Sequence, residues 1–200
     1  MHPEDTAARY DRIALWWQTQ HQDSLYGIPQ LERAIQFTPK KQLALEIGCG
    51  SSGRFIKVLS KHGFQVEGLD ISSEMINLAK QLHPHITFYR ADICCWNPPK
   101  PYSLIVAWDS TFHLPLDMQE PVMKKLCDAL ETNGLLMFTC GGGHRQGRVS
   151  GTFQGQAFEY STLGINAFLK ILDEYQCTCL HLEYDQYPEN HVYIIAQKTR

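Results

Sequence analysis

A glycine-rich turn after the first strongly apolar run constrains the fold of this chain more than any other feature. Residues 43–47 read Leu-Ala-Leu-Glu-Ile, which is typical of a buried parallel strand. Gly48, Gly50 and Gly53 follow with the G-x-G-x-x-G spacing, which allows a tight turn and lets bare backbone approach a ligand. Residues 54–60 then predict a helix whose free N–H groups point back at the turn. This order indicates an α/β fold with a nucleotide-like ligand at the turn, a pattern that many doubly wound proteins share.

Two acidic residues end the apolar runs that follow. Asp70 lies roughly 20 residues after the glycines, where a carboxylate accepts ribose hydroxyls. Asp92 follows the next run, at a position where a dinucleotide dehydrogenase has no standing need for an acid. Both acids have a plainer interpretation: Asp70 as the cap of the helix that starts near Ser73, and Asp92 as a cap or turn residue.

Together, these segments resemble the motifs of the class I S-adenosylmethionine-dependent methyltransferases. The segments that carry the resemblance are residues 45–53, 68–75, 90–93, 103–115 and 130–138. The resemblance runs from Leu43 to the C-terminus. Each motif alone would match many unrelated sequences, but five motifs in this order are specific to the family. It implies an α/β fold: a Rossmann-like, doubly wound seven-stranded sheet, mostly parallel, with an antiparallel C-terminal hairpin strand.

The rest of the chain alternates strands and helices in the way this fold requires. Strands are expected at 43–47, 65–69, 87–89, 104–108 and 135–139, and helices near 53–62, 73–82 and 118–130. Two last strands, 179–184 and 192–197, are joined by a loop so short that they must be antiparallel. Between them and the fifth strand, residues 140–151 are too rich in glycine for regular structure, so 141–155 is expected to be a movable loop. Ser161 is expected to cap a helix that ends near Glu174.

The 200 residues suit one domain, with residues 41–200 as the core and residues 1–40 as a helical lid. An amphipathic helix is expected at 3–20 and a second one at 29–37. The resemblance implies that this segment crosses the cofactor mouth, with Tyr10 facing the cofactor. The alternative is that Tyr10, Trp16 and Trp17 simply bury the helix on the core.

The resemblance implies S-adenosyl-L-methionine as the cofactor and S-adenosyl-L-homocysteine as its product. Glu46 would lie near the amino group, Asp70 would take the ribose hydroxyls, and Asp92 would accept from the adenine amino group. The other residues of the implied cofactor site are Tyr10, Gly48, Cys49, Gly50, Ile71, Met75, Ile93 and Trp108. Among these, Ile71 and Met75 would flank the adenine, and Ile93 would donate a backbone N–H.

Polar residues after the fourth strand are the candidates for catalysis. Ser103 stands where the family's fourth motif usually opens with an acid, which leaves Asp109 and His113 at the carboxyl edge of that strand. His113 suits a general base because its unperturbed pKa is near neutrality, and the alternative is that it only orders the loop. The transfer itself is an in-line displacement, so the enzyme must align donor and acceptor.

Later polar residues are expected to reach the same edge and line the acceptor pocket. These are His144, Tyr160 and His191. Together with His113 they suggest a metal cluster as an alternative, but no two of the histidines have the spacing of a ligand pair, so no metal is expected.

Composition limits the function classes. A net charge of −3 without runs of like charge argues against a broad nucleic-acid footprint. Seven cysteines in no metal-binding spacing, with no signal peptide, predict a reduced, cytoplasmic protein. No apolar run approaches the roughly 20 residues of a membrane span. We therefore expect no membrane or nucleic-acid partner, and a monomer or homodimer.

The leading hypothesis is methyl transfer to a small-molecule acceptor, because no appended domain or large insertion is visible that would grip a macromolecule. The alternative from another class is a non-catalytic S-adenosylmethionine-binding sensor or partner subunit. A nicotinamide-dependent oxidoreductase would keep the glycines but leave Asp92 and the C-terminal hairpin unexplained. The sequence does not identify the acceptor, nor whether the methylated atom is O, N, S or C.

Overall fold

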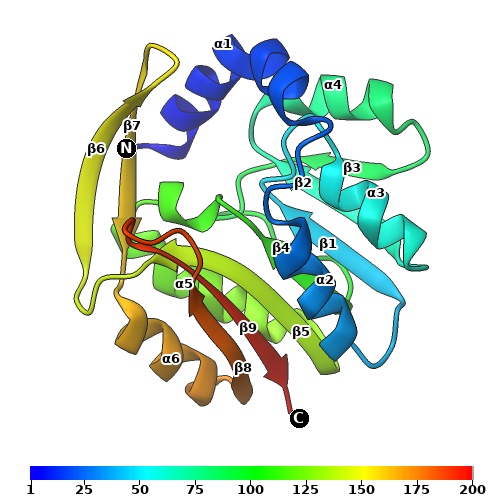
Figure 1. The fold of residues 1–200 in the computed structure, drawn as a ribbon, viewed down its shortest axis with the longest axis vertical. Helices are drawn as coiled ribbons and strands as arrows, with labels where there is room; N and C mark the ends of the chain where they lie inside the picture. Colours follow the sequence, from blue (N-terminus) through cyan, green and yellow to red (C-terminus); the bar gives the residue numbers. More distant parts are fainter. Residues whose placement is uncertain (200) are drawn as a thin grey trace.

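A computed structural model describes residues 1–199 and contains a central seven-stranded sheet (Figure 1). Its strands are β1 (Leu43–Ile47), β2 (Gln65–Asp70), β3 (Thr87–Arg90), β4 (Tyr102–Ala107), β5 (Leu130–Gly141), β8 (Cys177–Tyr184) and β9 (His191–Lys198). They are ordered β3-β2-β1-β4-β5-β9-β8. Strands β1 to β5 pair in parallel, whereas β9 runs antiparallel to both β5 and β8. The expected seven-stranded α/β sheet with its antiparallel C-terminal strand is confirmed.

Helices cover both faces of this sheet. The helices are α1 (Pro3–His21), α2 (Ile28–Phe37), α3 (Arg54–Lys61), α4 (Ser73–Leu82), α5 (Leu116–Asp128) and α6 (Ile165–Glu174), with a short 3-10 helix η1 (Thr111–His113). Helices α5 and α6 share one apolar core with one face of the sheet, and α2, α3 and α4 share a second core with the other face.

The central strands supply both cores because successive side chains of a strand point to opposite faces. In β5, Leu136 and Phe138 join the core under α5 and α6, while Leu135 and Met137 join the core under α2 and α3. All four side chains are fully buried. These strands therefore read as continuous apolar runs in the sequence, as expected for a sheet covered on both faces.

The glycine-rich segment after β5 is regular, which corrects the expectation of an irregular loop. Residues 147–162 form a two-stranded antiparallel hairpin of β6 (Gly147–Phe153) and β7 (Gln156–Thr162). Ser161 lies in β7 and does not cap a helix, because α6 begins at Ile165 after Gly164. The residues of β6 are mostly exposed, so the strand lacks the alternating apolar pattern that would have revealed it.

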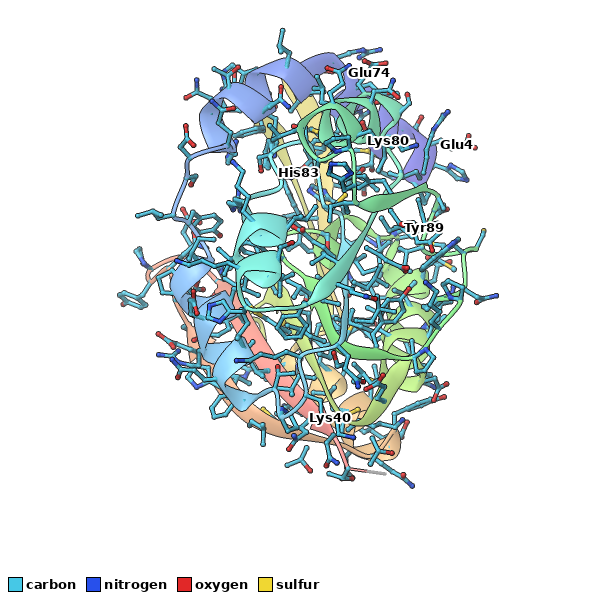
Figure 2. All side chains as sticks on the ribbon, turned by 90° about the vertical axis from the view of Figure 1, so that its right-hand side faces the viewer. Glu4, Lys40, Glu74, Lys80, His83 and Tyr89 are labelled. Carbon is cyan, nitrogen blue, oxygen red and sulfur yellow. The ribbon has the colours of Figure 1, made fainter. Side chains whose placement is uncertain are left out.

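Helix α1 and the β6–β7 hairpin lie beyond the carboxyl edge of the parallel strands (Figure 1). In Figure 2, Glu4 of α1 and Glu74 of α4 lie at one end of the molecule, and Lys40, just before β1, lies at the other. Ligands of open α/β sheets bind outside the carboxyl ends of the strands, so this end is where a site is expected. None of the helices within residues 1–199 has the length and apolar character of a membrane crossing.

Candidate active site

A cavity of about 340 Å³ lies at the carboxyl edge of the sheet. It is lined by every residue of the cofactor site that the resemblance implies: Tyr10, Glu46, Gly48, Cys49, Gly50, Asp70, Ile71, Met75, Asp92, Ile93 and Trp108. Asp109, His113 and Tyr160 line it as well, whereas His144 and His191 are not among the lining residues. A cavity of this size is on the scale of a small-ligand site.

The backbone of the glycine turn, residues 48–50, forms part of the cavity wall. Gly48 has φ 68°, and a Cβ on it would lie 2.5 Å from Cβ of Ser110, so a side chain at this position has no room. The N–H groups of Gly48 and Cys49 both donate to the carbonyl oxygen of Leu69, at 2.8 and 3.0 Å. The N–H groups of Gly48 and Cys49 are therefore not free to bind a ligand. The turn lets a ligand come close to the backbone, but these two groups donate no hydrogen bond to it.

Asp70 is held in place by two backbone groups. Its Oδ2 accepts from the N–H of Gly50 and its Oδ1 from the N–H of Ser72, each at 2.9 Å. The cap of α4 is Ser72, whose Oγ accepts from the N–H of Met75 at 3.1 Å, so Asp70 is not the capping residue. Burial raises the pKa of Asp70, although the backbone hydrogen bonds oppose this effect. Each carboxylate oxygen has a second lone pair that a ligand hydroxyl can use.

Asp92 both stabilises a turn and lines the cavity. Its Oδ1 accepts from the N–H of Cys94 at 2.9 Å, which is the turn role considered for it. Lys125 of α5 fixes the same loop, because its Nζ donates to the carbonyl oxygens of Ile93 and Trp96 at 2.7 and 2.8 Å. The loop that carries Asp92 is therefore tied to a helix behind the sheet.

Glu46 is a buried acid with an unused oxygen. Its Oε2 is buried and has no hydrogen-bond partner among the described residues. Burial raises the pKa of Glu46 to about 8, while the positive charge of Arg54 opposes the shift. At neutral pH the carboxyl group is mostly protonated until a cation reaches it.

Tyr10 and His113 join the N-terminal helix to η1. The hydroxyl of Tyr10 lies 2.8 Å from Nε2 of His113. Burial lowers the pKa of His113 to about 4, so its ring is neutral and is a weak base at neutral pH. Burial also raises the pKa of Tyr10. Tyr10 thus faces the cavity and holds the loop of His113 at the same time.

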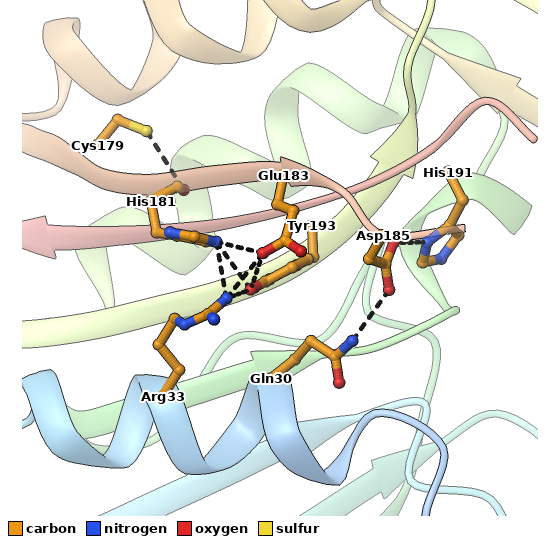
Figure 3. Close-up of polar contacts among 8 residues, drawn as sticks. All are labelled: Gln30, Arg33, Cys179, His181, Glu183, Asp185, His191 and Tyr193. Atoms are coloured by element: carbon orange, nitrogen blue, oxygen red, sulfur yellow. Dashed lines mark hydrogen bonds and ion pairs between the residues drawn. The ribbon is translucent and has the colours of Figure 1, made fainter. Parts of the chain in front are cut away.

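Asp109 is the end of a chain of hydrogen bonds that starts on α2. Figure 3 shows the first part of this chain, from Gln30 through Asp185 to His191. His191 Nε2 lies 2.8 Å from Oδ1 of Asp109, and His191 Nδ1 lies 2.6 Å from Oδ1 of Asp185. Gln30 of α2 donates to Oδ2 of Asp185 at 3.3 Å. Burial acts to lower the pKa of His191, but the hydrogen bonds to Asp109 and Asp185 outweigh it and raise the pKa. His191 therefore does not line the cavity itself but contacts two residues that do: Asp109 through this hydrogen bond and Trp108 through its ring, with centroids 5.7 Å apart.

The backbone of Asp109 is also unusual. Its φ is 49°, in the left-handed region that few residues other than glycine adopt. Its N–H donates to Oγ1 of Thr139 at 2.8 Å, which helps to hold this conformation. Non-glycine residues in such conformations cluster at functional sites, where the surrounding structure enforces them.

Aromatic side chains from α1 and the hairpin close the outer side of the cavity. Trp17 lines it and stacks on His21 with ring centroids 4.0 Å apart, and Trp16 packs against Phe153 of β6 at 5.5 Å. Neither tryptophan belongs to the two sheet cores, so burial on the core does not explain them. Tyr160 of β7 packs on His113 at 5.1 Å, while His144 is exposed.

Several residues that line the cavity were not among the site residues predicted from the sequence. Arg54, Tyr26, Trp17, His21 and Phe153 all line the cavity. Of these five, only Arg54 could have been predicted from the sequence. It directly follows the glycine turn, at the start of a helix whose N-terminus points at the ligand. The other four come from segments whose approach to the cavity depends on tertiary packing.

Comparisons with known proteins agree with this geometry. Residues 19–152 match the model of a family described as "Methyltransferase domain". A trans-aconitate 2-methyltransferase of Rhizobium rhizogenes is 29% identical over 94 residues, which are 46% of this chain and 36% of that protein. The chain thus spans well under half the length of this curated relative.

Solved structures share the fold over nearly the whole chain. An S-adenosylmethionine-dependent methyltransferase from Clostridium acetobutylicum superposes with a TM-score of 0.72 at 14% identity, covering 94% of this chain and 98% of that one. A Burkholderia thailandensis 1,6-didemethyltoxoflavin-N1-methyltransferase, solved with 1,6-didemethyltoxoflavin and S-adenosylhomocysteine bound, superposes with a TM-score of 0.69 at 14% identity, covering 100% and 92%.

Proposed function

The chain belongs to the methyltransferase family whose domain model it matches, and from this premise we propose that it transfers a methyl group from S-adenosylmethionine to a small molecule. One observation carries the proposal. Residues from four separate sequence motifs, represented by Glu46, Asp70, Asp92 and Trp108, line a single cavity at the carboxyl edge of the sheet. A nicotinamide cofactor would leave the acid at position 92 with a turn contact and no ligand to bind.

The cavity has polar groups that fit this cofactor. The unpartnered Oε2 of Glu46 suits an amino group, and the remaining lone pairs of Asp70 suit a ribose diol. Asp92 and the backbone of Ile93 would hold the adenine, between the apolar side chains of Ile71 and Met75. When bound, the cofactor supplies a methyl group on a positively charged sulfur.

The chain's own residues would then orient the acceptor and exclude water. Asp109 would orient the acceptor, because one of its oxygens remains free of His191, whereas the pKa of His113 is lowered to about 4, so His113 would be a weak proton acceptor. His113 would instead hold Tyr10 and the lid in place. Tyr160 would form part of the acceptor wall.

The relatives suggest two classes of acceptor. Carboxylic acids are one class to test, because the curated relative is named for trans-aconitate, and nitrogen heterocycles are another, because the Burkholderia structure holds 1,6-didemethyltoxoflavin. His144, which is exposed, would contact an acceptor only if the segment between β5 and β6 moved.

Calorimetric titration with S-adenosylmethionine, S-adenosylhomocysteine and NAD tests the proposal. We expect both adenosyl compounds to bind and NAD not to bind. Release of S-adenosylhomocysteine in the presence of a panel of acids, amines and phenols then reports turnover. Binding without turnover by any acceptor class would favour the sensor alternative, and binding of NAD alone would contradict the proposal.

A further inference from the structure

Two buried thiols lie side by side on the face of the sheet that α5 and α6 cover. Cys127 belongs to the last turn of α5, Cys177 is the first residue of β8, and both side chains pack in the same apolar core. The two thiols are close enough for a hydrogen bond from Cys127 to Cys177. Both cysteines are free thiols in this structure, so the pair is in its reduced state.

A lysine of β9 lies beside the pair. Lys198 is directly opposite Cys177 in the antiparallel ladder, so their side chains lie on the same face of the sheet. Its Nζ donates to the carbonyl oxygen of Cys127 at 3.2 Å and lies 4.0 Å from Oδ1 of Asp128. The side chain of Lys198 is mostly buried, so solvent screens its charge only weakly.

These contacts make the two thiols unequal. The hydrogen bond from Cys127 lowers the pKa of Cys177, and the charge of Lys198 adds to this effect, while burial opposes it. The same hydrogen bond, together with burial, raises the pKa of Cys127. Cys177 is therefore the thiol that ionises first, and a thiolate is the reactive form of cysteine.

A second cavity, of about 230 Å³, lies beside Cys177. Its lining residues are Asp173, Gln176, Cys177, Thr178 and Thr199. It lies at the opposite end of the sheet from the cavity of the candidate active site. The strand register shows this, because Cys177 pairs with Lys198 at the end of β9, whereas His191 at the start of β9 pairs with Gly141 at the carboxyl end of β5. A small polar oxidant can therefore reach Cys177 without entering the active site.

We propose that Cys127 and Cys177 form a site of reversible oxidation, at which hydrogen peroxide converts the two thiols into a disulfide bond. The thiolate of Cys177 attacks one peroxide oxygen, which breaks the O–O bond and leaves a sulfenic acid. The hydroxide released takes up the proton that Cys177 had lost and becomes water. The sulfur of Cys127 then displaces hydroxide from the sulfenic acid, and the thiol proton of Cys127 makes this a second water.

Two electrons pass from the thiols to the peroxide in this reaction, and a dithiol reductant returns them by thiol–disulfide exchange. The proposal does not depend on methyl transfer, because neither the thiols nor the second cavity belong to the candidate active site. Failure of one proposal therefore leaves the other standing.

A purely structural role for the two cysteines predicts different behaviour. Buried cysteines often serve as small apolar side chains, and both thiols would then stay inert. The exposed thiol of Cys95 would be oxidised before them. Apolar packing also gives no role to the ammonium group of Lys198 beside the pair.

The test treats the reduced protein with increasing concentrations of hydrogen peroxide, alkylates the remaining thiols and maps the disulfide-linked peptides by mass spectrometry. The variants are Cys127→Ala, Cys177→Ala and the control Cys179→Ala, which removes a thiol two residues further along β8. Parallel samples contain dimedone, which traps sulfenic acids. Differential scanning calorimetry compares the oxidised and the reduced wild type.

We expect the wild type and Cys179→Ala to form the bond between Cys127 and Cys177, and dithiothreitol to reverse it. The melting temperature of the linked wild type should rise by about 5–10 °C, because the bond closes a loop of about 50 residues in the unfolded chain. Cys127→Ala should accumulate the dimedone adduct at Cys177, because no thiol remains to displace the sulfenic hydroxide. Cys177→Ala should leave Cys127 unmodified.

Three results, all measured on the wild type, would overturn the proposal. The first is oxidation of Cys95 while Cys127 and Cys177 stay reduced. The second is a bond between Cys127 and Cys177 that forms only in urea, after the fold is lost. The third is a linked protein that melts at a lower temperature than the reduced one, which would mean that the bond forms only by distorting the fold. Because none of the three needs a variant, they decide the question even where a substitution prevents folding.

Discussion

Glu46 links the protonation of the cavity to the stability of the fold. Its pKa is raised to about 8 by burial, against a value of 4.5 for an unperturbed glutamate, so the folded state holds a proton that the unfolded state releases. The stabilisation from keeping that proton is complete below about pH 4.5 and is lost as the pH rises through about 8.

We therefore predict that Glu46→Gln, which is neutral at every pH, gains stability over the wild type as the pH rises from 5 to about 9. Urea unfolding of the two unliganded proteins at several pH values measures this difference. Glu4→Gln, at an exposed position of α1, serves as the control. A pH-independent difference between Glu46→Gln and the wild type would show that Glu46 is ionised in the folded state.

Asp70 is the residue for which cofactor binding gives the clearest test. Asp70→Asn keeps the shape of the side chain but removes its charge and one acceptor atom, so we predict a loss of about 1–3 kcal/mol in the binding free energy of S-adenosylhomocysteine. Titration calorimetry measures it, and urea unfolding shows whether the fold survives the change to the hydrogen bonds that Asp70 accepts from Gly50 and Ser72. Unchanged affinity in a folded variant would remove Asp70 from the cofactor site.

Asp185 is predicted to set the protonation of His191. The Nδ1 of His191 lies 2.6 Å from Oδ1 of Asp185, and this hydrogen bond favours the charged imidazolium. Asp185→Asn should therefore lower the pKa of His191, which NMR titration of the ring measures directly, whereas Gln186→Ala should not. An unchanged pKa would mean that Asp109 alone sustains the raised value.

The sequence predicted those site residues that lie in a recognisable local pattern, and it missed those whose role depends on the tertiary structure. Glu46, Asp70 and Asp92 were predicted because the motifs that contain them resemble those of the family, and these motifs lie in or directly after apolar runs. The carboxyl ends of parallel strands meet at one edge, so the three acids were expected to lie together. Asp185 was not found, because its role depends on the fold of the β8–β9 loop rather than on any local pattern. His113 was found, but its lowered pKa was not, since burial is a property of the tertiary structure.

At the scale of elements, α1 is fastened to both sides of the cavity. Asp11 of α1 accepts from the hydroxyl of Ser72 at 2.5 Å and from the N–H of Glu74 at 3.0 Å, so it helps to cap α4. On the other side, Arg12 donates to Oε1 of Gln156 at 3.0 Å, at the start of β7. The helix and the hairpin therefore form one cover over the cavity.

We predict that Asp11→Ala loosens this cover without unfolding the sheet, because α1 lies outside both sheet cores. Amide exchange of α1 should become faster, and S-adenosylhomocysteine should dissociate about 10-fold faster, the effect of losing roughly 1.4 kcal/mol. Asp5→Ala, at an exposed position of the same helix, is the control. Unchanged exchange and dissociation would show that the Asp11 contacts do not hold α1 over the cavity.

The elements themselves were predicted well wherever burial imposes a pattern. The strand at 43–47 and the helix at 73–82 have the expected bounds, because each alternates between buried and exposed positions or is buried throughout. The β6–β7 hairpin was missed because it pairs only with itself and leaves β6 mostly exposed, so glycine and polar residues occupy it without a core to constrain them.

At the scale of the whole molecule, one sheet separates two apolar cores, and β5 and β9 contribute to both. Neither core can open without exposing the other face of the same strands. A chain of this size and construction is expected to unfold in one cooperative transition. The cavity lies at the edge where α1, the hairpin and the strand ends meet, so a bound ligand restrains elements from all parts of the chain.

This arrangement predicts a global response to the ligand. At a concentration of about 100 times its dissociation constant, S-adenosylhomocysteine should stabilise the fold by roughly 2.7 kcal/mol. For a chain of this length that corresponds to a rise of about 5–10 °C in the melting temperature, as a shift of the whole transition. Differential scanning calorimetry measures both the shift and its cooperativity, and NAD at the same concentration is the control. A second transition that the ligand does not move would mean that part of the sheet folds independently of the cavity, which the strands shared by both cores argue against.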